Sequence, residues 1–140
     1  MATIQKFEDL VVWQKARLLN TAIYSLTNND FFNNDSGLQN QMRRASVSIL
    51  SNIAEGFERN GNKEFNQFLS IAKASAAELR AQIYIATDIR YITEEESVKY
   101  LAMVIEVSKM LNGLMSYLQN TDIKGNKFME EVAIYNRSYN

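Results

Sequence analysis

The chain lacks three residue types, and each absence narrows what the protein can do. None of its 140 residues is cysteine, so disulfides and thiol chemistry are excluded. Histidine is also absent, which removes the most frequent general base and the most frequent transition-metal ligand. Proline is absent too, so no segment is barred from being helical. The sequence therefore predicts no enzyme, no metal site and no cofactor.

The chain also lacks an excess of one charge and any long apolar run. Fifteen basic residues stand against sixteen acidic ones, so the chain as a whole is not a generic polyanion binder. No apolar run approaches the ~18 residues of a membrane span, and residues 1–16 show no signal-peptide pattern. We therefore expect a soluble, cytoplasmic protein without membrane contact. A hydrophobic content of 46% suits one globular domain.

Four long segments carry helical periodicity, and runs rich in Asn, Gly and Ser separate them. Apolar residues recur at spacings of three and four within residues 9–26, 36–57, 63–91 and 93–120. Asp9 is the expected N-cap of the first segment, and Thr93 with Glu96 is expected to form a capping box at the start of the fourth. Phe31 and Phe32, in the first connection, are expected to plug the space between helices. The expected buried stripe of the fourth segment comprises Val98, Leu101, Ile105, Ser108, Leu111, Met115 and Leu118.

These segments predict an all-α protein. Short connections between long helices favour an antiparallel up-down-up-down four-helix bundle over residues 1–120. Residues 121–140 are expected to form a polar C-terminal tail, partly ordered or docking on a neighbour. Within this tail, Phe128, Met129, Val132 and Tyr135 are spaced for one short helix.

A line of polar residues at spacings of three and four runs along the second segment. It comprises Gln41, Arg44, Ser48, Asn52 and Glu55. Solvated helix faces usually carry Lys and Glu, which favour helices more than Ser and Asn do. We therefore interpret the polar stripe as a contact surface, either inside the bundle or against another subunit, with a ligand-binding line as the alternative.

Basic residues are densest along the second segment and in the turn that follows it. The candidate nucleic-acid contacts are Arg43, Arg44, Arg59 and Lys63, with Lys15 and Arg17 added from the first segment. The alternative is ordinary salt bridging with neighbouring glutamates. Glu55, Glu78 and Glu106 lie on three different segments, but without histidine they do not complete the pattern of a di-iron bundle.

Sequence signatures of a known family occur in order along residues 7–119. They are FEDLVVWQKA at residues 7–16, QMRRASVSILSNIAEG at 41–56, EFNQFLSIAKASAAEL at 64–79 and MLNGLMSYL at 110–118. The chain thereby resembles the four-helix-bundle proteins encoded by intervening sequences within bacterial 23S rRNA genes. That family includes the accessory variability proteins of diversity-generating retroelements.

The resemblance implies a barrel-shaped homopentamer that binds nucleic acid. In the retroelement branch, the barrel works with RNA, DNA and a reverse transcriptase. The residues themselves also favour an oligomer, because a lone bundle would leave apolar patches exposed at Val11, Leu18, Ala22, Val47 and Ala54. Two functions follow as hypotheses: a non-enzymatic, nucleic-acid-binding accessory protein, or an oligomeric scaffold that binds another protein.

Overall fold

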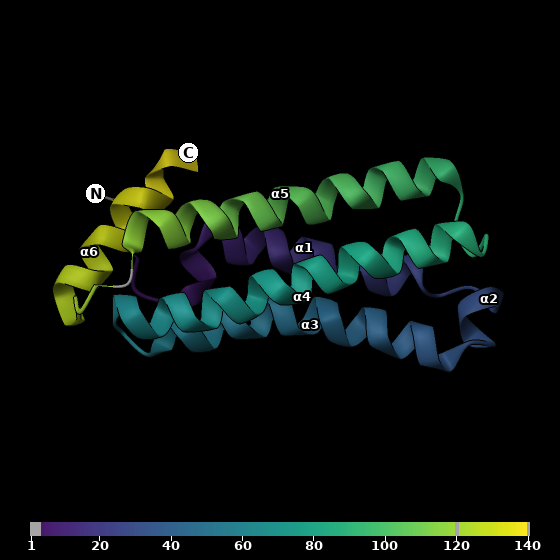
Figure 1. Cartoon of the computed structure of the whole chain (residues 1–140). Coiled ribbons are helices and arrows are strands. Elements are labelled where there is room, and N and C mark those ends of the chain that lie inside the picture. Colours follow the sequence, from purple (N-terminus) through teal and green to yellow (C-terminus); the bar gives the residue numbers. More distant parts are fainter. Residues whose placement is uncertain (1–3, 120, 140) are drawn as a thin grey trace.

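The computed structural model describes residues 4–119 and 121–139, and these residues are almost entirely helical (Figure 1). No β-strand occurs in this described part, which contains only one isolated bridge, between Gly61 and Lys124. The prediction of an all-α protein is confirmed. In chain order the elements are η1 (Phe7–Asp9), α1 (Val11–Leu26), α2 (Asp30–Asn33), α3 (Ser36–Glu58), α4 (Asn62–Asp88), α5 (Glu94–Leu118), α6 (Gly125–Asn136) and η2 (Arg137–Tyr139).

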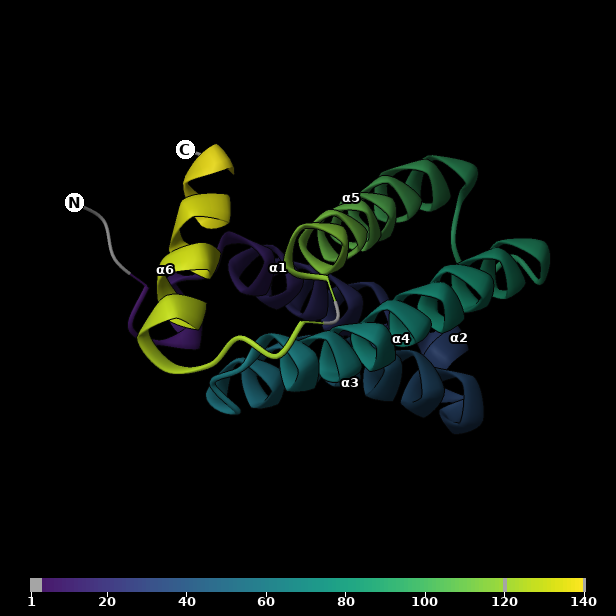
Figure 2. The ribbon, with the colours of Figure 1, turned by 60° about the vertical axis from the view of Figure 1, so that its left-hand side comes forward.

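The four long helices form the predicted antiparallel bundle. Helix α1 packs beside α3 and α5, and α4 packs beside the same two helices. Figures 1 and 2 show these helices running side by side, with α2 at one end of the bundle and α6 at the other. Within the described residues, no helix combines the length and the apolar character needed to cross a bilayer.

Three of the four long helices begin or end at residues whose local chemistry explains the boundary. Asp35 caps α3 by accepting a hydrogen bond from the Leu38 N–H at 3.2 Å. Thr93 and Glu96 form the predicted capping box of α5, with bonds of 3.0 and 2.9 Å. Arg90 follows α4 with a φ of 65°, the left-handed conformation that commonly ends a helix.

The expected cap of α1 by Asp9 is wrong. Asp9 lies inside η1, and α1 begins two residues later at Val11. The cap comes from the distant Asn136, whose Oδ1 accepts a hydrogen bond from the Val11 N–H at 2.8 Å. The Asn136 Nδ2 also donates to the Asp9 carbonyl at 3.1 Å. A partner 125 residues away in the chain cannot be seen in local sequence.

Of the buried stripe expected on α5, Leu111 and Leu118 are buried, but the N-terminal part of the stripe is wrong. Val98 is 70% exposed, and Leu101 and Ile105 are only half-buried. Helix α5 is apolar on two neighbouring faces, so its periodicity is compatible with two rotations about its axis. The structure selects the face formed by Ser97, Val104, Val107, Met110, Leu111, Leu114 and Leu118.

Phe31 and Phe32 behave differently, although both were expected to plug the bundle. Phe32 is fully buried, whereas Phe31 is 58% exposed. Both lie in the short helix α2, where consecutive side chains point about 100° apart, so only one of them can face the bundle. Both rings contact Tyr91, with centroid distances of 5.6 Å for Phe31 and 5.2 Å for Phe32.

Helix α6, in the segment expected to be a polar tail, packs against its own chain. Phe128 is fully buried and lies 5.7 Å from each of the Phe57 and Phe65 rings. Asn62, at the start of α4, donates a hydrogen bond to Glu131 of α6 at 3.1 Å. Helix α6 therefore closes the end of the bundle at which α3 passes into α4.

Gly56 allows α3 and α4 to approach closely. A Cβ atom at Gly56 would lie 2.5 Å from Phe68 Cβ and 2.9 Å from Phe65 Cδ1, which is too close for carbon atoms. We expect Gly56→Ala to push the helices apart and lower the free energy of unfolding by about 1–3 kcal/mol, measured by urea denaturation. Gly37→Ala is the matched control, because its Cβ would lie 3.7 Å from Asp35 Oδ1. Equal stability of the two variants would contradict this account.

Candidate interaction surfaces

The middle of the polar stripe lies between α3 and α4. The hydroxyl oxygens of Ser48 and Ser75 are 2.8 Å apart and share a hydrogen bond. Asn52 Nδ2 donates to the Ser48 carbonyl at 2.8 Å and to the Ser48 hydroxyl at 3.0 Å. These short side chains let the two helices pack closely, so this part of the stripe forms contacts between helices inside the bundle.

The two ends of the polar stripe lie on the outer surface of α3. Gln41, Arg44 and Glu55 are exposed. Within the described residues, neither Arg44 nor Glu55 forms a salt bridge; the ion pairs found there join Lys15 to Glu106 and Lys124 to Asp122. These ends of the stripe are therefore available to a partner, and a role in assembly stays a prediction.

The structure does not bring the predicted basic residues into one cluster. Arg43 and Arg59 are sixteen residues apart on or just after α3, which corresponds to about 24 Å along a helix. Arg43 is folded against α1, where its Nε donates to Thr27 Oγ1 at 2.9 Å and its guanidinium lies 4.7 Å from the centre of the Tyr24 ring. Arg44 and Lys63 are exposed on different turns of the fold.

The remaining basic candidates have local partners. Lys15 Nζ lies 3.2 Å from a Glu106 carboxylate oxygen. The Arg17 guanidinium lies over Trp13, 5.6 Å from the ring centre, and that of Arg59 lies over Phe68 at 5.1 Å. A single chain therefore offers scattered positive charges, and nucleic-acid contact through these six residues stays a prediction.

The carboxylates considered for a metal centre do not converge. Glu55, Glu78 and Glu106 are all exposed, and Glu106 pairs with Lys15. Among the described residues, no group of three or more acidic side chains is placed to hold a metal ion.

The outside of α4 carries an apolar face that was not predicted from the sequence. Ile71 and Ile85 are 49% and 48% exposed, and Tyr84 and Ile89 are exposed to a similar extent. We call the following exposed residues the α4 face: Ile71, Ala74, Ala77, Ala81, Tyr84, Ile85 and Ile89. Their spacing of three, four and seven was visible in the sequence, but the same helix also carries a mostly apolar buried stripe that dominates the pattern.

Helix α5 extends the α4 face. Lys73 Nζ donates to Asn112 Oδ1 at 2.8 Å, and Thr87 Oγ1 donates to Ser97 Oγ at 2.9 Å. These two bonds fix the antiparallel register of α4 and α5 and place the exposed Val98 beside the C-terminal half of the α4 face. The apolar surface therefore spans two helices.

A smaller apolar area lies on α1 and α3, where exposed patches were predicted. Leu18 and Val47 are exposed, whereas Val11, Ala22 and Ala54 are half-buried. These positions therefore contribute less exposed apolar surface than α4 does.

The fold and the surfaces together define the class of protein: an all-α four-helix bundle whose most distinctive outer feature is an exposed apolar face on α4. The chain belongs to the family of 23S rRNA-intervening sequence proteins, whose family model matches residues 8–113.

A solved structure has the same fold: that of a protein of unknown function from the S23 ribosomal protein family of Bacteroides thetaiotaomicron VPI-5482. The two chains share 24% sequence identity and superpose with a TM-score of 0.68, over 78% of this chain and 99% of the other. No curated protein has a significantly similar sequence. Helix α6 lies beyond the residues that the family model matches.

Proposed function

We propose that this protein is a non-enzymatic scaffold that works as a homo-oligomer assembled through the α4 face. The observation that carries the proposal is the composition of this face. Of the ten exposed residues between Ile71 and Ile89, seven are apolar, and the others are Glu78, Arg80 and Asp88. The exposed side of a surface helix normally carries mostly charged and polar residues.

The shape and the rim of the α4 face suit a protein partner. From Ile71 to Ile89 the helix rises about 27 Å, so the face runs along most of α4. The exposed ends of the polar stripe, Arg44 and Glu55, lie on the neighbouring helix α3. An apolar centre with a polar rim is the usual anatomy of a protein–protein interface. Five subunits is the number that the family resemblance implies.

The runner-up function is nucleic-acid binding, which the resemblance implies and the single chain supports less well. Arg43 already donates a hydrogen bond to Thr27 at the end of α1, and Arg59 lies about 24 Å away from Arg43 along the helix. The net charge of −1 gives no general attraction to phosphate. RNA, DNA and a reverse transcriptase therefore stay predicted partners only.

The proposal predicts that charge on the α4 face separates the subunits. Light scattering of the unaltered chain is expected to give a mass of about five times 16.1 kDa. Ile71→Lys combined with Ile85→Lys is expected to give a single-chain mass with an unchanged helical circular dichroism spectrum, because buried lysine charges oppose association. Ile134→Lys, at an exposed isoleucine on α6, is the matched control and should leave the mass unchanged.

Two outcomes would contradict the proposal. A monomeric unaltered chain would exclude the homo-oligomer, and an unchanged mass in the double variant would place the interface away from α4.

Fluorescence anisotropy with a labelled structured RNA tests the runner-up function. Binding at low salt that is lost both in Arg44→Ala/Arg59→Ala and at higher salt would favour the nucleic-acid role.

A further inference from the structure

Helix α6 is joined to the bundle by one short connection, which leaves α5 at Gln119. Figure 2 shows this connection running across the end of the bundle to α6. Its last part is already paired with the start of α4, because the Asn62 N–H donates to the Ile123 carbonyl at 2.8 Å. The unit that docks on the bundle therefore begins at Ile123. We call residues 123–139 the docking segment.

The docking segment packs on residues from several parts of the chain, and we call the surface that it covers the docking site. Phe128 lies against Phe57 at the end of α3 and Phe65 at the start of α4. Asn136 accepts the hydrogen bond from the Val11 N–H at the start of α1. Each of these contacts joins the docking segment to the bundle, so all of them can form equally well when another copy of the chain supplies the segment.

The bundle is a complete fold without the docking segment. The four long helices end at Leu118, and the family model ends before α6, at residue 113. The solved relative places 99% of its own chain on 78% of this one. The docking segment is therefore an addition to a finished bundle.

The backbone is strained at Gln119, where the chain turns away from α5. Its φ of 55° and ψ of 179° form a combination that residues with a Cβ atom rarely adopt. Two hydrogen bonds hold it there: the Gln119 N–H donates to the Met115 carbonyl at 3.0 Å, and the Asn66 side chain donates to the Gln119 carbonyl. This strained turn directs the chain from α5 back onto its own docking site.

We propose that the docking segment exchanges between two copies of this chain, so that the segment of each copy occupies the docking site of the other. Exchange preserves the contacts of the segment and frees Gln119 to adopt an ordinary conformation, and a strained connection of this kind favours exchange. Exchange is opposed by the chain's own segment, whose effective concentration is on the order of millimolar. Exchange therefore occurs in concentrated protein or between copies that are already held together.

This interaction goes beyond the proposed scaffold and does not use the α4 face. The docking site lies at one end of the bundle, whereas Ile71 and Ile85 lie along the outside of α4. The test is made in the Ile71→Lys/Ile85→Lys variant, in which exchange is expected to persist although contact through the α4 face is lost. Failure of the α4 interface and failure of exchange are distinguishable in this way.

Engineered cysteines detect exchange directly, because the chain has none of its own. Gly61 forms an antiparallel bridge with Lys124, and a Cβ atom at Gly61 would lie 3.3 Å from Lys124 Cγ, so a disulfide can join these positions. Gly61→Cys and Lys124→Cys are made in separate chains, mixed at a concentration on the order of millimolar and then oxidised. Mass spectrometry of proteolytic fragments is expected to find residue 61 of one chain linked to residue 124 of another.

Two controls establish that this disulfide reports docking. Gly61→Cys and Lys124→Cys in the same chain should form the disulfide within that chain, which shows that the variants fold and that the geometry permits the bond. Ile134→Cys in place of Lys124→Cys should give no link to residue 61, because this exposed position lies about 14 Å further along α6. A link from Ile134→Cys as frequent as that from Lys124→Cys would mean random collision and would overturn the proposal.

A pair of variants at Gln119 tests the role of the strained turn. Gln119→Gly relieves the strain in the unexchanged chain, because glycine adopts this conformation freely. It is expected to lower the yield of the disulfide between chains by about tenfold. Gln119→Ala is the matched control, since it removes the same side chain but keeps the Cβ atom, and its yield should be unchanged. Equal yields from these two variants, or no link between chains when the single-chain disulfide forms, would also overturn the proposal.

Discussion

Replacing Phe128 with alanine is expected to lower the free energy of unfolding by about 3–5 kcal/mol, the usual cost of deleting a buried aromatic ring. Phe128 has no exposed surface, and its ring lies 5.7 Å from those of Phe57 and Phe65. The deletion leaves a cavity between α6 and the bundle that these rigid rings cannot fill. Urea denaturation followed by circular dichroism measures the loss.

Ile134→Ala is the matched control for this experiment, because Ile134 lies on the exposed side of the same helix. Its stability should stay within about 0.5 kcal/mol of the unaltered chain. A loss below about 1 kcal/mol for Phe128→Ala would mean that α6 is not packed against the bundle in solution.

Asn62→Asp is expected to be as damaging, at about 3–5 kcal/mol, because it leaves a buried charge without compensation. Asn62 is fully buried, and its Nδ2 donates to the Leu118 carbonyl at 3.2 Å, to Thr121 Oγ1 at 3.0 Å and to Glu131 Oε2 at 3.1 Å. Aspartate replaces that donor with a second carboxylate oxygen facing the same acceptors. Thermal or urea unfolding at neutral pH checks the size of the loss.

The pH dependence of Asn62→Asp gives a second, independent check. Protonation of the introduced carboxyl group restores a donor, and burial raises its pKa above the ordinary value of about 4. The loss is therefore expected to shrink as the pH falls from neutral to about 4, where the carboxyl is protonated in the folded and the unfolded chain alike. Asn126→Asp, at an exposed position in α6, should show neither the loss nor its pH dependence. A loss that is the same at pH 7 and at low pH would indicate disrupted packing instead of charge repulsion.

Local chemistry made most of the helices predictable. The apolar stripe of α3 through Met42, Ala45, Ile49 and Ile53 is flanked by polar residues, so only one face can turn inward, and all four residues are buried. The capping box of α5 is a local signal and was also predicted correctly. The buried face of α5 was not predicted correctly along its whole length, because an apolar residue such as Val98 also fits the helical period on the exposed face.

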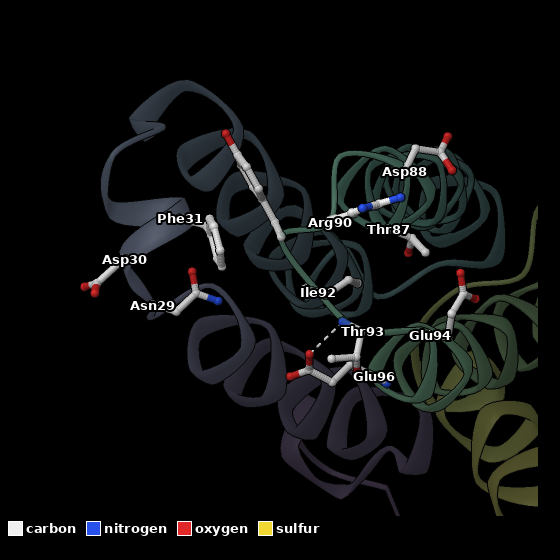
Figure 3. Close-up of a pocket in the computed structure, with 11 residues that line it drawn as sticks. Asn29, Asp30, Phe31, Thr87, Asp88, Arg90, Ile92, Thr93, Glu94 and Glu96 are labelled. Atoms are coloured by element: carbon white, nitrogen blue, oxygen red, sulfur yellow. Dashed lines mark hydrogen bonds between the residues drawn. The ribbon is translucent and has the colours of Figure 1, made fainter.

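The interaction surfaces were less predictable, because they depend on which residues remain uncovered after packing. The sequence marks Ile71 and Ile85 as apolar, but only the bundle shows that α3 and α5 leave them exposed. Arg43 and Arg59 look close in the sequence, but a straight helix separates them by about 24 Å. One open cleft at an end of the bundle (Figure 3) is lined by both Phe31 and Arg90, two residues from different connections that no local pattern relates.

The hydrogen bond from Val11 to Asn136 links the order of synthesis to the order of folding. Ribosomes make the chain from its N-terminus, so α1 emerges long before residue 136 is available to accept the Val11 N–H. Until then, the unpaired backbone N–H groups in the first turn of α1 can form hydrogen bonds only with water. The four long helices all precede Asn136 in the chain, so they can assemble during translation before the side chain that completes the first of them has been made.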